Sequence, residues 1–137
     1  MTMRVEFVSP EDTLYSGDAA QVIARTRGGG DIAFLTGHEP FIGSLLTCEV
    51  RVTEDSGTVR RFAVRGGFVS VTGTEVTVLS DAAVAAEDVD VAKARADLAE
   101  ATAAEQANPE DPYARDDRQW AEIRLIAAGQ GTDAQPH

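Results

Sequence analysis

The strongest constraint on the fold is a series of short runs, continuing to about Ser80, in which apolar and polar residues alternate. In the first run, Met3 to Ser9, Val5 and Phe7 lie on one face and charged residues on the other, as in a half-buried strand. Similar runs occur at residues 20–25, 46–52, 58–65 and 76–79. Many short strands at regular spacing predict a β-sandwich or a flattened barrel.

Two positions predict breaks between these strands. Ser16-Gly17-Asp18 is a turn signal that separates a short strand at Leu14-Tyr15 from the run at residues 20–25. Gly66-Gly67 interrupts a later run, and the pair predicts a bulge or corner that redirects the strand. Both signals favour many short strands over a few long ones.

The most informative stretch runs from Gly28 to Leu45. It opens with three glycines, which tolerate positive φ, and continues with a short apolar run of strand length at residues 32–35. A second turn follows at residues 37–40, because Pro40 has no N–H to donate and disfavours helical backbone before it. The stretch is either a plain corner of the sandwich or a rigid loop that presents polar groups to a partner.

The composition changes after Ser80. Residues 81–107 are rich in alanine, which favours helix. Asp88 or Asp90 can cap this helix, residues 108–112 end it, and Asp111-Pro112 is the N-cap and first position of a second helix. The second helix has apolar residues at helical spacing and a glycine C-cap: Tyr113, Trp120, Ile123, Ala127 and Gly129. The sequence therefore predicts a helical hairpin that docks weakly, since alanine buries little area, and a disordered tail after it.

Charge and composition exclude several functions. A net charge of −11 and a pI near 4.4 argue against nucleic-acid binding and against adsorption to anionic lipid. No apolar run has the length of a membrane-spanning helix, and the start does not resemble a signal peptide. Cys48 is the single cysteine and is expected to be a partly buried strand residue.

No catalytic, metal or cofactor site is predicted. The glycines at 28–30 are not followed by the Lys-Ser/Thr of a phosphate-binding loop, and no helix begins there. His38 and His137 are too far apart in the sequence to suggest a metal cluster. His38 and Glu39 could be half of a general acid–base pair, but no Ser or Cys nucleophile with a convincing partner can be named. We therefore interpret His38 as a turn histidine that is hydrogen-bonded to backbone.

Three motifs in order resemble the ε subunits of bacterial F-type ATP synthases. The family pattern Gly-Glu-x-Gly-Ile-Leu-Pro-Gly-His-Ala-Pro-Leu-Ile is similar to residues 30–42, Gly-Asp-Ile-Ala-Phe-Leu-Thr-Gly-His-Glu-Pro-Phe-Ile. The pattern Val-x-Gly-Gly-Phe, then Val-Thr-Val-Leu, is similar to residues 64–68 and 76–79. Ser9-Pro10-Glu11 with the following Leu-Tyr-Ser-Gly is also typical. Ala33 and Thr36 depart from the pattern, where the family has glycine and proline.

The resemblance implies ten strands in two five-stranded sheets, followed by an antiparallel α-helical hairpin. It implies a non-catalytic stalk protein that joins the γ shaft to the membrane-embedded c-ring, peripheral to the cytoplasmic face of a bacterial inner membrane. Residues 1–86 would form the platform, residues 87–129 a regulatory hairpin, and residues 130–137 the tail. The c-ring contact would be Asp31, and the γ contacts would be His38, Glu39, Phe41 and Ile42.

The resemblance also bears on regulation. Relatives that sense ATP carry Ile/Leu-Asp-x-x-Arg-Ala, matched here at residues 89–94 with Lys93 in place of arginine, so we expect weak ATP binding, through Asp90 and Lys93. In relatives that brake hydrolysis, the second helix meets the acidic α/β catalytic head. Here its basic and acidic residues balance, so we expect weak inhibition: Arg115, Arg118 and Arg124 against Asp116, Asp117 and Glu122. Two alternatives stay open, a free ATP-sensing module and a small β-sandwich enzyme.

Overall fold

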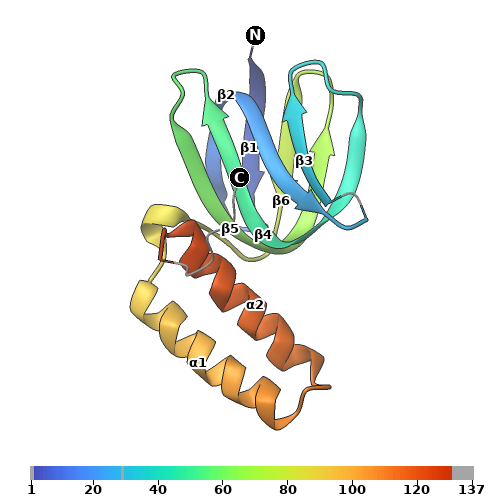
Figure 1. The fold of residues 1–137 in the computed structure, drawn as a ribbon. Helices are drawn as coiled ribbons and strands as arrows, with labels where there is room; N and C mark the ends of the chain where they lie inside the picture. The colour runs from blue at the N-terminus through green and yellow to red at the C-terminus, as the bar shows by residue number, and fades with distance from the viewer. Residues whose placement is uncertain (1, 29, 131–137) are drawn as a thin grey trace.

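The computed structural model describes residues 2–28 and 30–130 as a β-structure followed by two packed helices (Figure 1). The strands are β1 (Met3–Val8), β2 (Thr13–Thr26), β3 (Gly30–Leu35), β4 (Phe41–Glu54), β5 (Val59–Val71), β6 (Glu75–Leu79) and β7 (Ala83–Ala85). A 3-10 turn, η1 (Ala86–Asp88), leads to α1 (Val91–Ala107) and α2 (Pro112–Ala127). The predicted order of strands first and helices second is confirmed.

The strands form one hydrogen-bonded path in the order β1-β6-β5-β4-β2-β3, with β7 paired to β5. Because β1 also pairs with β2, the path closes on itself around a core of alternating inward side chains. Phe7 and Phe62 stack in that core with ring centroids 4.5 Å apart. We call these strands the sandwich; they leave β3 and β7 as short edges.

The predicted count of ten strands in two five-stranded sheets is wrong for this structure, which has seven strands in its described residues. The reason is that β2, β4 and β5 are 13 or 14 residues long, and that β2 and β5 pass through the positions predicted to break them. Ser16-Gly17-Asp18 lies inside β2, whose register shifts farther along, so the strand bends at bulges without ending.

Gly66 and Gly67 redirect β5, as predicted, without ending it. Their φ angles are 73° and 130°, a region that favours glycine. A Cβ at Gly67 would also lie 2.2 Å from the Leu79 carbonyl oxygen. Glycine is therefore required here by both conformation and close approach.

Both predicted N-caps are confirmed. The Asp90 carboxylate accepts a bond from the Lys93 N–H (3.1 Å), and the Asp111 carboxylate accepts one from the Tyr113 N–H (2.9 Å), with Pro112 opening α2. Gly129 has φ 78° just past α2. The alanine-rich stretch nevertheless contributes β7, because pairing with β5 overrides its helix propensity.

The buried face of α2 matches the predicted one only in part. Of the predicted residues, Ala127 is buried, Trp120 and Ile123 are half-buried and Tyr113 is 79% exposed. The other buried residues of the helix are Ala114, Ala121 and Leu125. Of the predicted disordered tail, Gln130 is described and bonds to Arg95, and residues 131–137 lie outside the described residues. Cys48 is buried in β4, and burial raises the pKa of its thiol.

Candidate functional site

The corner at residues 36–42, which joins β3 to β4 and includes the first two residues of β4, carries the γ-contact residues predicted from the sequence. Gly37, at φ 89°, donates its N–H to the Gly73 carbonyl (2.8 Å). The His38 N–H donates to the Leu35 carbonyl (3.0 Å). These bonds tie the corner to the end of β3 and to the turn between β5 and β6, so its shape is fixed.

His38 has a structural position in this corner. Its ring lies edge-on to buried Phe34, with centroids 5.0 Å apart. Its Nδ1 lies 2.8 Å from the Glu39 carbonyl oxygen, and since a carbonyl can only accept, Nδ1 carries the hydrogen. This is the turn histidine bonded to backbone that the sequence analysis favours over an acid–base catalyst.

The other three predicted γ-contact residues differ in how far their side chains are exposed to a partner. Phe41 is half-buried and packs on Phe34, with ring centroids 5.7 Å apart. Glu39 is exposed, and Ile42 is 79% exposed at the start of β4. Ile42 is therefore the main apolar group that this corner presents to solvent.

Ile42 continues into an exposed apolar surface that the sequence analysis missed. Phe68 is 56% exposed and Leu79 is 45% exposed. Ile42 pairs with Ser70, two residues from Phe68 on the same face of β5, and Phe68 pairs with Leu79 of β6. We call Ile42, Phe68 and Leu79 the apolar stripe; it crosses three neighbouring strands.

Strand alternation is the signal that could have found this stripe. Val69 and Val71 of β5 are buried, and so are Val76 and Val78 of β6. In a period of two, residues between or beside buried positions face outward. Because the residues next to them in the strands face the core, Phe68 and Leu79 face outward, although both side chains are apolar.

Asp31 lies at the opposite end of β3 from the corner. It is paired in register with Arg25 of β2, and the two side chains form a two-point ion pair, with Arg25 Nε 2.8 Å from Asp31 Oδ1 and Nη2 3.3 Å from Oδ2. The hydrogen bond to Asp31 raises the pKa of Arg25. At about 3.3 Å per residue, the four steps of β3 from Asp31 to Leu35 separate Asp31 from the start of the corner by about 13 Å, so they form two separate surfaces.

Asp90 and Lys93, the predicted nucleotide contacts, take part in bonds within α1. Asp90 caps the helix, and Lys93 Nζ lies 3.3 Å from the Asp97 carboxylate one turn later. Both contacts stabilise α1 in the structure. Weak ATP binding through these residues stays a prediction.

The described part of the chain contains no cluster of three or more His, Cys, Asp or Glu side chains that could hold a metal ion. Within the same residues, none of the helices has the length and apolar character needed to cross a membrane.

Comparisons with known proteins agree with this geometry. A family model described as the β-sandwich domain of the ATP synthase delta/epsilon chain matches residues 2–86. The ATP synthase epsilon chain of Rhodococcus erythropolis is 46% identical over 99 residues, covering 72% of this chain and 80% of the relative. That of Corynebacterium urealyticum is 44% identical over 104 residues, covering 74% and 82%.

Among solved structures, a chain of the Euglena gracilis mitochondrial ATP synthase aligns with a TM-score of 0.69 and 23% identity. The alignment covers 94% of this chain and 78% of that one. At this identity the likeness shows a shared fold.

Proposed function

The chain belongs to the ATP synthase delta/epsilon family, and on that premise we propose that it is the central-stalk ε subunit that joins the γ shaft to the c-ring. The observation that carries this proposal is the arrangement of two exposed surfaces on one closed sandwich. The apolar stripe and its corner lie at one end of β3, and the Arg25–Asp31 pair lies at the other. The protein would transmit torque and catalyse no reaction of its own.

The sandwich suits a torque-bearing joint. Its strand path closes through the β1–β2 pairing, and its core side chains are almost fully buried. Close-packed interiors have low compressibility and transmit strain. We therefore assign residues 1–86 to the platform and residues 87–129 to a regulatory hairpin.

The apolar stripe is the proposed γ surface, together with His38, Glu39 and Phe41. Exposed apolar groups that gather on one face mark protein interaction sites, and interface energy concentrates in a few such side chains. Ile42 and Phe68 are the two most exposed members of the stripe. The fixed corner beside them would orient γ without itself supplying most of the affinity.

Asp31 is the proposed c-ring contact. Because Arg25 holds its carboxylate, the pair would present guanidinium donors and carboxylate acceptors together to the polar loops of the c-ring. Through these protein contacts we place the chain at the cytoplasmic face of a bacterial inner membrane.

We propose that the hairpin inhibits ATP hydrolysis only weakly. Each basic residue of α2 is already engaged: Arg115 and Arg118 with Glu105, and Arg124 with Asp97. Little positive charge is left for an acidic α/β head. Deleting residues 87–137 in the assembled enzyme should raise ATP hydrolysis by less than about tenfold, which corresponds to about 1.4 kcal/mol of restraint; a larger rise would refute weak inhibition.

The alternatives make different predictions. A free ATP sensor would bind nucleotide tightly through α1, whereas we expect calorimetry to show weak binding at best through Asp90 and Lys93. A pull-down from detergent-solubilised membranes tests the stalk role: we expect this chain to co-purify with a multi-subunit ATPase. Recovery as a soluble monomer with its own turnover would instead favour an enzyme.

A further inference from the structure

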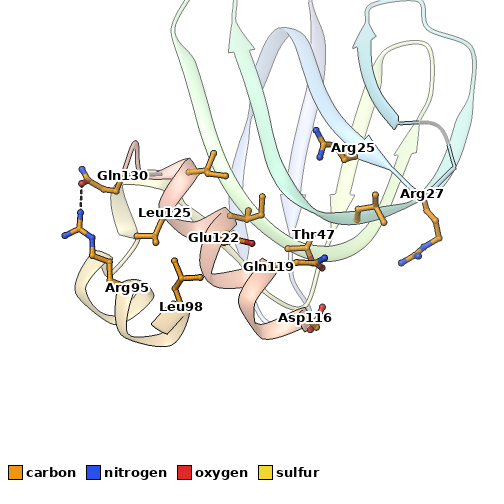
Figure 2. Close-up of a pocket in the computed structure, with 13 residues that line it drawn as sticks. Arg25, Arg27, Thr47, Arg95, Leu98, Asp116, Gln119, Glu122, Leu125 and Gln130 are labelled. Atoms are coloured by element: carbon orange, nitrogen blue, oxygen red, sulfur yellow. Dashed lines mark hydrogen bonds between the residues drawn. The ribbon is translucent and has the colours of Figure 1, made fainter. Parts of the chain in front are cut away.

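A cleft of about 660 Å³ lies between α2 and the strands, with Thr47 of β4 on one side and Gln119 of α2 on the other (Figure 2). Small-molecule sites in proteins have volumes of about 300–1,000 Å³, so the cleft is large enough for a ligand. The residues predicted to contact γ, the c-ring or a nucleotide are not among those that line it. The cleft is therefore separate from the surfaces described above.

Aliphatic side chains from three elements line the cleft. They are half-buried, so part of each side chain is still in contact with water: Leu46 of β4, Leu98 of α1, and Ile123 and Ile126 of α2. Removing apolar surface from water is favourable and scales with the area that is covered. The cleft thus offers an apolar binding surface to a ligand that carries an alkyl chain.

The two acidic residues in the lining are already neutralised. Asp116 Oδ2 lies 3.0 Å from Arg65 Nε, and Glu122 Oε1 lies 2.6 Å from Arg118 Nη1. Neither of these arginines lines the cleft. The carboxylates are therefore held by cations from outside it, and they leave little negative charge to repel an anion.

Arg27 is the lining residue whose charge is not compensated. Arg25 is held by its carboxylate partner on β3, and Arg95 donates to the Gln130 side chain at the other end of the cleft (2.9 Å; Figure 2). Arg27, by contrast, has no ion pair or side-chain hydrogen bond with the residues that the structure describes. Its backbone is fixed, because its N–H donates to the Ser44 carbonyl (2.8 Å). A guanidinium in this state suits a carboxylate, which it can bind through two parallel hydrogen bonds.

We propose that this cleft binds a small amphipathic anion, an alkyl chain that ends in a carboxylate. Arg27 would bind the carboxylate, and the chain would lie on Leu46, Ile123 and Ile126. Within the described residues the side chains of Thr47 and Gln119 make no hydrogen bond, so they are free to serve as further donors. The site is a property of the chain alone and does not rest on the proposed stalk role.

Titration of the full-length chain with decanoate, followed by methyl NMR, tests the proposal. Decanoate should shift the methyl signals of the residues that line the cleft and leave those of the apolar stripe unchanged: Leu46, Leu98, Ile123 and Ile126 against Ile42 and Leu79. Hexanoate should bind more weakly, by up to about fourfold for each methylene removed, the value for full burial of a CH₂ group. Decyltrimethylammonium, with the same chain and the opposite charge, should bind at least about tenfold more weakly than decanoate.

Two variants test the two ends of the site. Arg27→Gln should weaken decanoate binding about five- to tenfold, between the values for an exposed ion pair and a charge-assisted hydrogen bond. Gln119→Trp should abolish binding, because it fills the cleft from an exposed position on α2 without removing any core side chain. The matched control is Arg60→Gln, since Arg60 is an exposed arginine of β5 that pairs with Glu54 (3.3 Å) and does not line the cleft.

The remaining outcomes overturn the proposal. Shifts confined to the methyl groups of the apolar stripe, or loss of binding in Phe68→Ser, would mean that decanoate only adsorbs to that stripe. Equal binding of decanoate and the cationic amphiphile, or equal weakening by Arg27→Gln and Arg60→Gln, would contradict an anion site at Arg27. Much tighter decanoate binding by a chain that ends at Gln130 would mean that residues 131–137 occupy the cleft themselves.

Discussion

Phe68 and Leu79 lie opposite each other on neighbouring antiparallel strands, with about half of each side chain exposed. Together with Ile42 they form an apolar surface on a protein that otherwise carries a net charge of −11. An acidic protein gains solubility from its charge, so a cluster of exposed apolar side chains on one face requires another explanation. We explain this surface by a partner protein that covers it.

Replacing Phe68 with serine should therefore weaken binding to γ by at least about tenfold, because central aromatic residues carry much of an interface's energy. Titration calorimetry with purified γ measures the change. Val59→Ser is the control, since Val59 is also exposed on β5 but lies outside the stripe. Equal losses in both variants would argue against a localised γ surface.

Asp31→Asn should reduce association with the c-ring while changing the free energy of unfolding of the isolated chain by less than about 1 kcal/mol. Its ion pair with Arg25 is half exposed, and such pairs contribute little stability. Binding to detergent-solubilised membrane sector and urea unfolding measure the two effects. Asp18→Asn is the matched control, because Asp18 is an exposed carboxylate 3.8 Å from Arg4; a similar binding loss there would contradict a specific role for Asp31.

Tyr15 should make stability fall at high pH. Burial, and the hydrogen bond that Tyr15 Oη donates to Glu54, raise its pKa to about 12. The phenol has a pKa of about 10 in the unfolded chain, so the folded state holds its proton more tightly. The resulting stabilisation of the folded state is fully present below about pH 10 and is lost as the pH rises toward about 12. Between these values the parent should lose about 1 kcal/mol more than Tyr15→Phe, allowing for solvation of the phenol.

Chemical unfolding across that pH range measures the difference. The control is Tyr113→Phe, since Tyr113 is 79% exposed. Parallel pH profiles for the parent and Tyr15→Phe would show that Tyr15 does not couple ionisation to folding.

Thr36→Val should stabilise the protein by about 1 kcal/mol, because the buried Thr36 hydroxyl has no hydrogen-bond partner among the described residues. Thr26→Val should do the opposite, since its buried hydroxyl donates to the Gly30 carbonyl (3.3 Å). Urea unfolding compares the two. A loss of stability in Thr36→Val would contradict an unsatisfied hydroxyl at this position.

The features that the sequence predicts well are local ones. Asp90, Asp111 and Pro112 define the starts of the helices, because a cap depends on the residues within one turn of it. The corner at Gly37 is also local, since a positive φ there requires glycine.

The features that the sequence predicts poorly depend on residues that are far apart along the chain. Ala83–Ala85 becomes a strand only because β5 lies beside it, and Ser16-Gly17-Asp18 stays in β2 because neighbouring strands continue to pair there. The contact from Arg65 to Asp116 spans 51 positions and has no local signature. The apolar stripe is intermediate: alternation places each member outside, but only the register brings them together.

The most direct test of the stalk role is reconstitution. The full-length chain is added to inner-membrane vesicles whose ATP synthase lacks this subunit, and proton pumping driven by ATP hydrolysis is measured. We predict that the chain restores coupled pumping and that the double variant Ile42→Asp with Phe68→Ser, folded to the same extent, does not. Failure of the parent chain to restore pumping, or equal restoration by the double variant, would contradict a sandwich that couples γ to the c-ring through the apolar stripe.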